Sequence, residues 1–243
     1  MKIDEKLLEA AKDYKYLLER GYNKKSALKF VGERYLLNET ERHVLYRTVF
    51  PANEARKRRE KIAKEDEVEN NILVIDCYNV LITVETMLKN GIILEADNGY
   101  IRDISAIFRK YKITNLTEKA LNLIIQAIKN LKPAQTIFIV DQPISKSGEL
   151  AAKIRNLLQK HNIKGTAKTT KHPDKELTQT PGIIATSDTI IINKAQKTFD
   201  LPAYILKNYF KNKAKFIKLK HINLKQEHQQ KPQQQKQQNG PVA

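Results

Sequence analysis

The chain has 243 residues, 41% of them hydrophobic, so it can bury one large core or two smaller ones. Its formal charge of +17 favours polyanionic partners, above all the phosphates of RNA or DNA. No apolar run reaches the roughly 18 to 20 residues that span a bilayer, and the charged N-terminus does not match a signal peptide. Because Cys77 is the only cysteine, an internal disulfide is excluded, and we expect a cytoplasmic protein without a membrane partner.

Residues 1–50 carry apolar side chains at helical spacing and no alternating strand pattern, which predicts a small helical domain. Gly21 is expected to end the first helix. Asn38, with Glu41 three residues later, has the spacing of a capping box that opens a third helix. Residues 51–70 carry charges on all sides, which predicts a solvated helix or linker.

Residues 71–221 have a different pattern, in which short runs rich in β-branched residues alternate with helical stretches. The runs end in carboxylates and read as buried parallel strands: ILVID at 72–76, TIFIVD at 136–141 and GIIATSD at 182–188. The helical stretches cover residues 79–90, 117–131 and 147–161. This alternation predicts an α/β domain with a doubly wound, mainly parallel sheet.

Two further strands are predicted, one at 163–169 and one at 214–219, the second at an edge that closes the domain. The Gln-rich residues 222–243 have almost nothing to bury, and we expect them to be disordered.

Three of the predicted strands finish on Asp76, Asp141 and Asp188, and the carboxyl ends of strands in such a sheet face the binding crevice. A single strand-end aspartate is more often a turn former or a helix cap. Three together would repel one another unless a cation neutralised them. Mg²⁺ or Mn²⁺ suits oxygen ligands, so the sequence predicts a divalent metal site.

The segment VIDCYNVLI resembles the opening strand of the PIN-like and NYN nuclease families, with Cys77 where glycine is common. The later ATSD is similar to their Thr-x-Asp or Ser-Asp element, and Asp174 in HPDKEL stands where NYN-type sequences carry another acid. A more specific likeness is to a family of uncharacterised archaeal proteins. These join a helical domain, with motifs matching residues 20–37 and 41–47, to a PIN-like domain.

The resemblance implies metal-assisted hydrolysis of a phosphodiester bond that leaves a 5′ phosphate. The implied catalytic and metal-binding residues are Asp76, Asp141 and Asp188, joined by Asp174 or Glu85. Asn79 would orient Asp76, and Thr186 or Ser187 would do the same for Asp188. Capping of helices and turns explains the three supporting residues equally well, and Glu85 could instead lie exposed on the far face of its helix.

Basic and hydroxyl side chains in three segments are candidates for contact with RNA: Lys24, Lys25, Arg42, Arg47, Arg102, Ser145, Lys146 and Ser147. Each has a structural alternative. Arg102 could form an ordinary ion pair within its loop, where Asp97 is a further possible ligand, and either serine could cap the helix that follows it.

The leading hypothesis is therefore a Mg²⁺- or Mn²⁺-dependent ribonuclease whose helical domain and basic linker grip RNA, with ribosomal RNA and tRNA as candidate substrates. The first alternative is a PIN-like RNA-binding or ribosome-associated protein that has lost catalysis. The second is a DNA-binding regulator that uses a helix-turn-helix at residues 22–47. The sequence does not indicate an oligomeric state.

Overall fold

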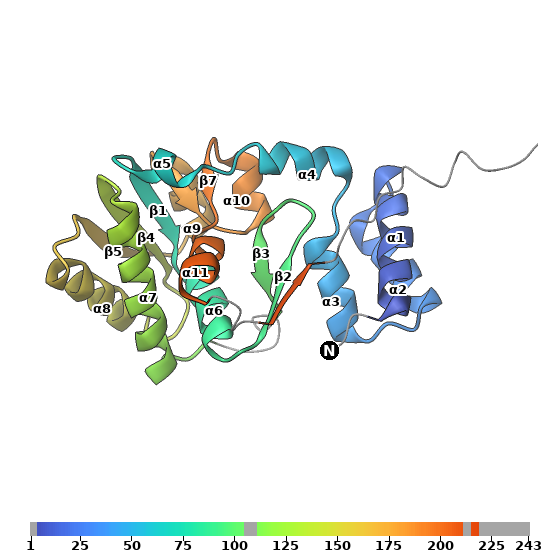
Figure 1. The fold of residues 1–243 in the computed structure, drawn as a ribbon, viewed down its shortest axis with the longest axis horizontal. Helices are drawn as coiled ribbons and strands as arrows, with labels where there is room; N and C mark the ends of the chain where they lie inside the picture. The colour runs from blue at the N-terminus through green and yellow to red at the C-terminus, as the bar shows by residue number, and fades with distance from the viewer. Residues whose placement is uncertain (1–3, 105–110, 211–214, 219–243) are drawn as a thin grey trace, which may run out of the picture.

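The computed structural model describes residues 4–104, 111–210 and 215–218 (Figure 1). The predicted disordered tail, residues 222–243, lies outside this part of the chain. Three helices, α1 (Glu5–Glu19), α2 (Lys24–Arg34) and α3 (Glu39–Thr48), form the N-terminal bundle around a core that includes Leu7, Tyr14 and Leu45. Asn38 and Glu41 form the predicted capping box of α3, with hydrogen bonds of 2.9 and 2.8 Å.

The segment predicted as a solvated helix or linker folds into two helices, α4 (Ala52–Arg59) and α5 (Glu65–Val68). It is only partly solvated, because Ala55 and Arg58 are buried. Ala55 packs with Phe50 and Ala96, and Nε of Arg58 donates to the side chain of Asn193 at 2.9 Å. Helix α4 therefore packs against the α/β domain.

The main sheet has five parallel strands in the order β5-β4-β1-β6-β7, which confirms the doubly wound α/β fold. These strands are β1 (Ile72–Asp76), β4 (Gln135–Asp141), β5 (Gly165–Thr170), β6 (Ile183–Ala185) and β7 (Thr198–Phe199). The chain builds one side of the sheet with β4 and β5 and then crosses to the other side of β1 with β6 and β7. The switch in winding direction therefore lies at β1, where such sheets form their crevice.

One strand ends earlier than its sequence suggested. The prediction that the third run ends as a strand on Asp188 is wrong, since β6 stops at Ala185. Asp188 instead caps α10 (Thr189–Lys194), accepting from the backbone N–H groups of Ile190 and Ile191 at 2.7 and 3.3 Å. A polar segment of three residues thus connects the strand to the helix.

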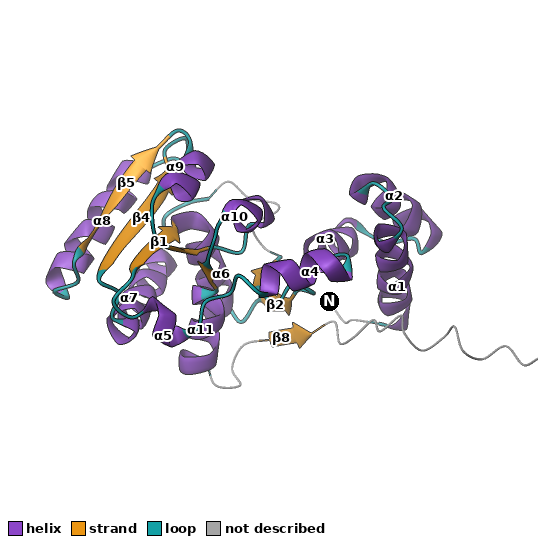
Figure 2. Ribbon diagram, turned by 90° about the horizontal axis from the view of Figure 1, so that it is seen from above, coloured by secondary structure: helices purple, strands orange, loops and turns teal. Residues whose placement is uncertain are grey.

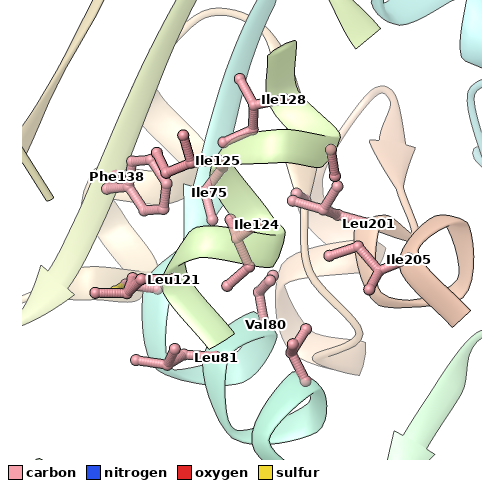
Figure 3. Close-up of a cluster of buried hydrophobic side chains, with 14 of the residues drawn as sticks. Ile75, Val80, Leu81, Leu121, Ile124, Ile125, Ile128, Phe138, Leu201 and Ile205 are labelled. Atoms are coloured by element: carbon pink, nitrogen blue, oxygen red, sulfur yellow. The ribbon is translucent and has the colours of Figure 1, made fainter. Parts of the chain in front are cut away.

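Helices cover both faces of the main sheet (Figure 2). One face carries α6 (Cys77–Leu88), α7 (Asn115–Leu131), α8 (Ser147–Lys160) and α11 (Leu201–Tyr209), and the other carries α9 (Pro173–Gln179) and α10. Strand β1 is covered on both faces because its side chains alternate: Leu73 and Ile75 belong to the larger core and Val74 to the smaller one. Figure 3 shows Ile75 with the isoleucines of α7 in the larger core.

A second, smaller sheet with the order β3-β2-β8 lies between the helical bundle and the main sheet (Figure 1). Its strands are β2 (Ile92–Glu95), β3 (Ile101–Asp103) and β8 (Lys215–Lys218). The strand predicted at 214–219 is thus an edge strand, but of this small sheet, where it pairs in parallel with β2.

The hairpin between β2 and β3 holds the helical bundle in place. Val44 of α3 packs against Leu94. Asp97 in the turn accepts a hydrogen bond from the backbone of Phe50 at 3.2 Å and pairs with Lys15 at 3.2 Å, so it joins the two domains. Within the described residues, no helix is both long and apolar enough to cross a membrane.

Candidate functional site: an acidic pocket beside a basic pocket

A pocket of about 250 Å³ opens at the carboxyl ends of the central strands, where the winding of the sheet reverses. Five aspartates line this acidic pocket: Asp76, Asp103, Asp141, Asp174 and Asp188. Four of them were predicted from the sequence. Asp103 was missed, although it ends β3 in the same way that Asp76 and Asp141 end their strands. Its carboxylate accepts from Thr83 of α6 at 3.3 Å.

Asp76 has the most perturbed carboxylate of the pocket. Its pKa is raised from 3.8 to about 7, mainly by burial and to a smaller extent by the negative charges of Asp188 and Asp174. Hydrogen bonds from the Thr186 hydroxyl, at 2.8 Å, and from the backbone of Asn79 oppose this rise. Asp76 is therefore held in a fixed position, in surroundings that penalise its charge unless a cation is near.

The other acids cover a range of exposure. Asp141 is half-buried, and its pKa is raised by burial and, to a smaller extent, by Asp174. Asp174 is exposed in the first turn of α9, and Asp188 is half-buried at the start of α10. Asp103 is buried, and Asp76 is half-buried like Asp141 and Asp188. The pocket thus runs from a deep carboxylate at Asp103 to an exposed one at Asp174.

The supporting residues act on different partners from those predicted. Thr186 was assigned to Asp188, but its hydroxyl donates to Asp76 and accepts from the backbone N–H of Asp188 at 3.0 Å. Asn79 was expected to orient Asp76 with its side chain, which instead accepts from the backbone and hydroxyl of Ser187 at 2.9 and 3.1 Å. Together these bonds fasten the segment after β6 to α6 and to the end of β1.

Glu85 does not line the acidic pocket, so the structure does not bring it together with the other predicted metal ligands. It is buried and accepts hydrogen bonds from Tyr111 and Thr117, both at 2.7 Å. The alternative that it lies exposed is wrong. The reason is that α6 turns this side chain toward α7, whose Thr117 supplies one of the two bonds.

The aspartates agree with a hard divalent cation in their chemistry, but not as a preformed ligand cage. Among the residues that the structure describes, no group of three acidic, histidine or cysteine side chains is close enough to hold a metal ion. Mg²⁺ in phosphoryl-transfer sites is usually held by one or two carboxylates, with water and substrate oxygens completing its shell. Asp76 with one neighbouring aspartate suits that arrangement.

A second pocket, of about 430 Å³, adjoins the first and shares Arg47, Asn79 and Asp188 with it. We call it the basic pocket, because four cationic side chains line it: Lys24, Arg47, Arg58 and Arg102. Phe50 also lines it, and three of the cations lie near its ring, with Lys24 Nζ 4.1 Å, Arg58 Cζ 4.7 Å and Arg102 Cζ 5.6 Å from the ring centroid. Three of these cations were predicted to contact RNA, and Arg58 was missed.

The remaining predicted RNA-binding residues do not line either pocket. Arg42 donates to the carbonyl of Leu37 at 2.9 Å and so has a structural role in the bundle. Lys146 pairs with Glu149 at 3.5 Å, and Ser147 donates to the carbonyl of Gln142 at 3.0 Å. No side chain caps α8, so the alternative of serine capping is wrong as well. The exposed members of the set are Lys25, Ser145 and Lys146.

Two family models match successive parts of the chain. The model described as "Domain of unknown function (DUF5616)" matches residues 65–204, and the one described as "Protein of unknown function (DUF434)" matches residues 6–61. The uncharacterized protein MJ0935 of the archaeon Methanocaldococcus jannaschii is 35% identical over 184 residues, which are 76% of this chain and 88% of that protein. No solved structure matches the chain.

Proposed function

We propose that this chain, which belongs to the DUF5616 family, is a Mg²⁺- or Mn²⁺-dependent ribonuclease built on a PIN-like α/β domain. The observation that carries the proposal is the acidic pocket itself. It gathers five aspartates at the switch point of a parallel sheet, in a chain whose formal charge is +17. A concentration of negative charge inside a basic protein suits a divalent cation and a polyanionic substrate.

Asp76 would be the principal ligand, because its position is fixed by Thr186 and its charge is stabilised by a nearby cation. Asp141 or Asp188 would be the second ligand. When bound, the metal supplies stabilisation of the developing charge on the phosphate and a water of lowered pKa. Asp174, exposed at the rim, meets the solvent from which an attacking water would come.

Arg47 would position the substrate. Among the described residues it is the cation that lines both pockets, beside the aspartates of one and the other cations of the second. A guanidinium binds two phosphate oxygens in one plane, which fixes orientation as well as distance. The proposed substrate is therefore an RNA strand whose phosphates follow the path from the basic pocket to the acidic pocket.

Cleavage of single-stranded RNA and of tRNA in Mn²⁺ tests this proposal. Asp174→Asn is the most informative variant, because an exposed side chain can be replaced with little effect on folding. We expect Asp174→Asn to reduce cleavage and Asp76→Asn to reduce it by roughly 100-fold or more. Asp66→Asn removes the same charge from an exposed position on α5 and serves as the matched control. Undiminished cleavage in Asp76→Asn would overturn the proposed site.

A second candidate function is RNA binding without cleavage. It is favoured by the lack of three closely grouped metal ligands in the described residues. In that case RNA would bind to the wild type and to Asp76→Asn with equal affinity, and no product would form at any Mn²⁺ concentration. Product formation by the wild type that is lost in Asp76→Asn excludes this candidate.

A further inference from the structure

We propose that the basic pocket binds a terminal phosphate group, that is, a phosphomonoester dianion. The pocket is built from both domains. Lys24 and Arg47 come from the helical bundle, Arg58 from α4 and Arg102 from β3. Phosphate binding there does not depend on the nuclease proposal.

The strongest support is the state of the two buried arginines. Arg102 is 5% exposed and Arg58 is 7% exposed. Nε and Nη2 of Arg102, and Nη1 of Arg58, have no hydrogen-bond partner among the described residues. Buried polar groups in folded proteins are almost always satisfied, because an unmade bond costs free energy. Both arginines line the pocket, so a small shift of either guanidinium would offer these open donors to a ligand that accepts several hydrogen bonds.

The charge balance of the pocket indicates how negative that ligand is. Four cations line it against two carboxylates, Glu54 and Asp188, so two positive charges remain when His43 is neutral. One of the carboxylates already pairs with Arg58, at 2.7 Å. A phosphate monoester carries about −1.5 to −2 at pH 7 and offers three strong acceptor oxygens, whereas a phosphodiester within a strand carries one charge. The monoester matches the excess more closely.

Phe50 keeps these cations together when no anion is bound. An aromatic face attracts cations, and its ring has three of them within 6 Å, as given above. The attraction does not remove their mutual repulsion. Burial, together with the smaller effects of the charges of Arg102 and Arg58, lowers the pKa of Lys24 to about 8. An anion in the pocket would relieve both effects.

Because the two pockets share Arg47, Asn79 and Asp188, a phosphate held in the basic pocket lies beside the aspartates. If the proposed function holds, the ligand is the phosphorylated end of an RNA strand, and the enzyme acts on RNA that carries a terminal phosphate. This step rests on the proposed function. A free mononucleotide presents the same phosphate chemistry, so the experiment must separate the two sources.

The test measures binding to the full chain in EDTA, so that neither metal nor cleavage contributes. The probes are one RNA oligonucleotide with a 5′-phosphate, a 3′-phosphate or only hydroxyl ends, together with a mononucleotide and inorganic phosphate. We expect at least one phosphorylated oligonucleotide to bind roughly 10-fold more tightly than the hydroxyl form. Mononucleotide binding as tight as that would assign the pocket to free nucleotides, and weaker binding would assign it to RNA ends.

Lys24→Gln and Lys25→Gln form a matched pair, because neighbouring residues lose the same charge and only Lys24 lines the pocket. Lys24→Gln should abolish the preference for phosphate, and Lys25→Gln should keep it. Arg47→Gln, at a half-buried position, provides a second variant with the same expectation as Lys24→Gln, and thermal unfolding checks that each variant is folded. Equal affinity for all oligonucleotides, or a preference that survives in both pocket variants, would overturn the proposal. If the protein prefers phosphorylated ends in EDTA but does not cleave RNA in Mn²⁺, the ribonuclease proposal fails and the phosphate-binding proposal still holds.

Discussion

The hydroxyl of Thr186 donates a hydrogen bond of 2.8 Å to the carboxylate of Asp76, across neighbouring strand ends that lie 110 positions apart in the chain. The same hydroxyl accepts from the backbone of Asp188, so it links two acids of the pocket. Asp76 is thus held in place before any ligand arrives. Such preorganisation is what a carboxylate needs if it is to bind a cation with little loss of entropy.

Thr186→Val should raise the pKa of Asp76 further, because it removes a hydrogen bond that favours the charged carboxylate and keeps the shape of the side chain. A hydrogen bond to a charged group contributes roughly 1.5–3 kcal/mol, which corresponds to about one to two pKa units. A carboxyl carbon titration followed by NMR measures the change. Ser187→Ala removes a neighbouring hydroxyl that bonds to Asn79 and serves as the control. An unchanged or lower pKa in Thr186→Val would contradict this role.

The pKa of Asp76 predicts a pH dependence of stability in metal-free protein. The unfolded carboxyl loses its proton near pH 4, as free aspartates do, whereas the folded one keeps it until about pH 7. Between these values the unfolded state binds fewer protons, so this residue makes the protein less stable as pH rises from about 4 to about 7, and adds no further change above that.

Urea unfolding of the wild type and of Asp76→Asn in EDTA, from pH 4.5 to pH 8, measures this contribution. The variant has no charge to bury. Its free energy of unfolding, relative to that of the wild type, should therefore increase as pH rises. Adding Mn²⁺ at pH 8 should stabilise the wild type and have a smaller effect on the variant. Parallel curves for the two proteins would show that Asp76 titrates at an ordinary pKa.

Glu85→Gln separates structure from chemistry. Glu85 is buried with Tyr111 and Thr117, which both donate to it, and it does not line the acidic pocket. The amide keeps one acceptor oxygen and places donors where an acceptor stood, so we expect a loss of about 1–3 kcal/mol in the free energy of unfolding. RNA cleavage per folded molecule should stay at the wild-type level. If the folded variant instead cleaved less RNA and needed more Mn²⁺ to do so, Glu85 would have to be counted among the metal ligands.

RNA affinity should fall steeply with salt, because each phosphate contact displaces about 0.7 counterions from a single strand. Filter binding at several salt concentrations gives the slope of log affinity against log salt. The variant Arg47→Gln should reduce that slope by about 0.7, which is one contact. In the wild type the guanidinium of Arg42 donates to the carbonyl of Leu37, so Arg42→Gln should leave the slope nearly unchanged. A flat salt response of the wild type would contradict an RNA-binding role.

Much of the acidic pocket could be predicted because the carboxyl ends of parallel strands converge. Asp76 and Asp141 end two adjacent parallel strands, and Asp141 lies two residues beyond Ile139, the partner of Asp76. Finding the strands was therefore enough to place both carboxylates at the same edge of the sheet. Asp103 was not predicted as a pocket residue because β3 has three residues and belongs to the small sheet. A strand that short has no alternation that sequence could reveal.

The basic pocket was harder to foresee because it depends on how helices dock. Four basic residues occupy the last turn of α4, and only Arg58 among them is buried. The buried one is held by Asn193, which lies 135 positions further along the chain and could not be paired with it from the sequence. The placement of Glu85 could not be predicted for the same reason. Its helix was predicted, but the face that packs on α7 is set by tertiary contacts and not by local spacing.

Asp97 has a wider consequence, because it ties the helical bundle to the hairpin that carries Arg102. Neither pocket is the property of one half of the chain. A fragment that starts at β1 would keep all five aspartates and lose Arg47 and Phe50, and the bundle alone would keep those two and none of the acids. Neither half expressed alone would therefore present the acidic and the basic side chains next to each other, and a truncated protein is no substitute for the full chain in a binding assay.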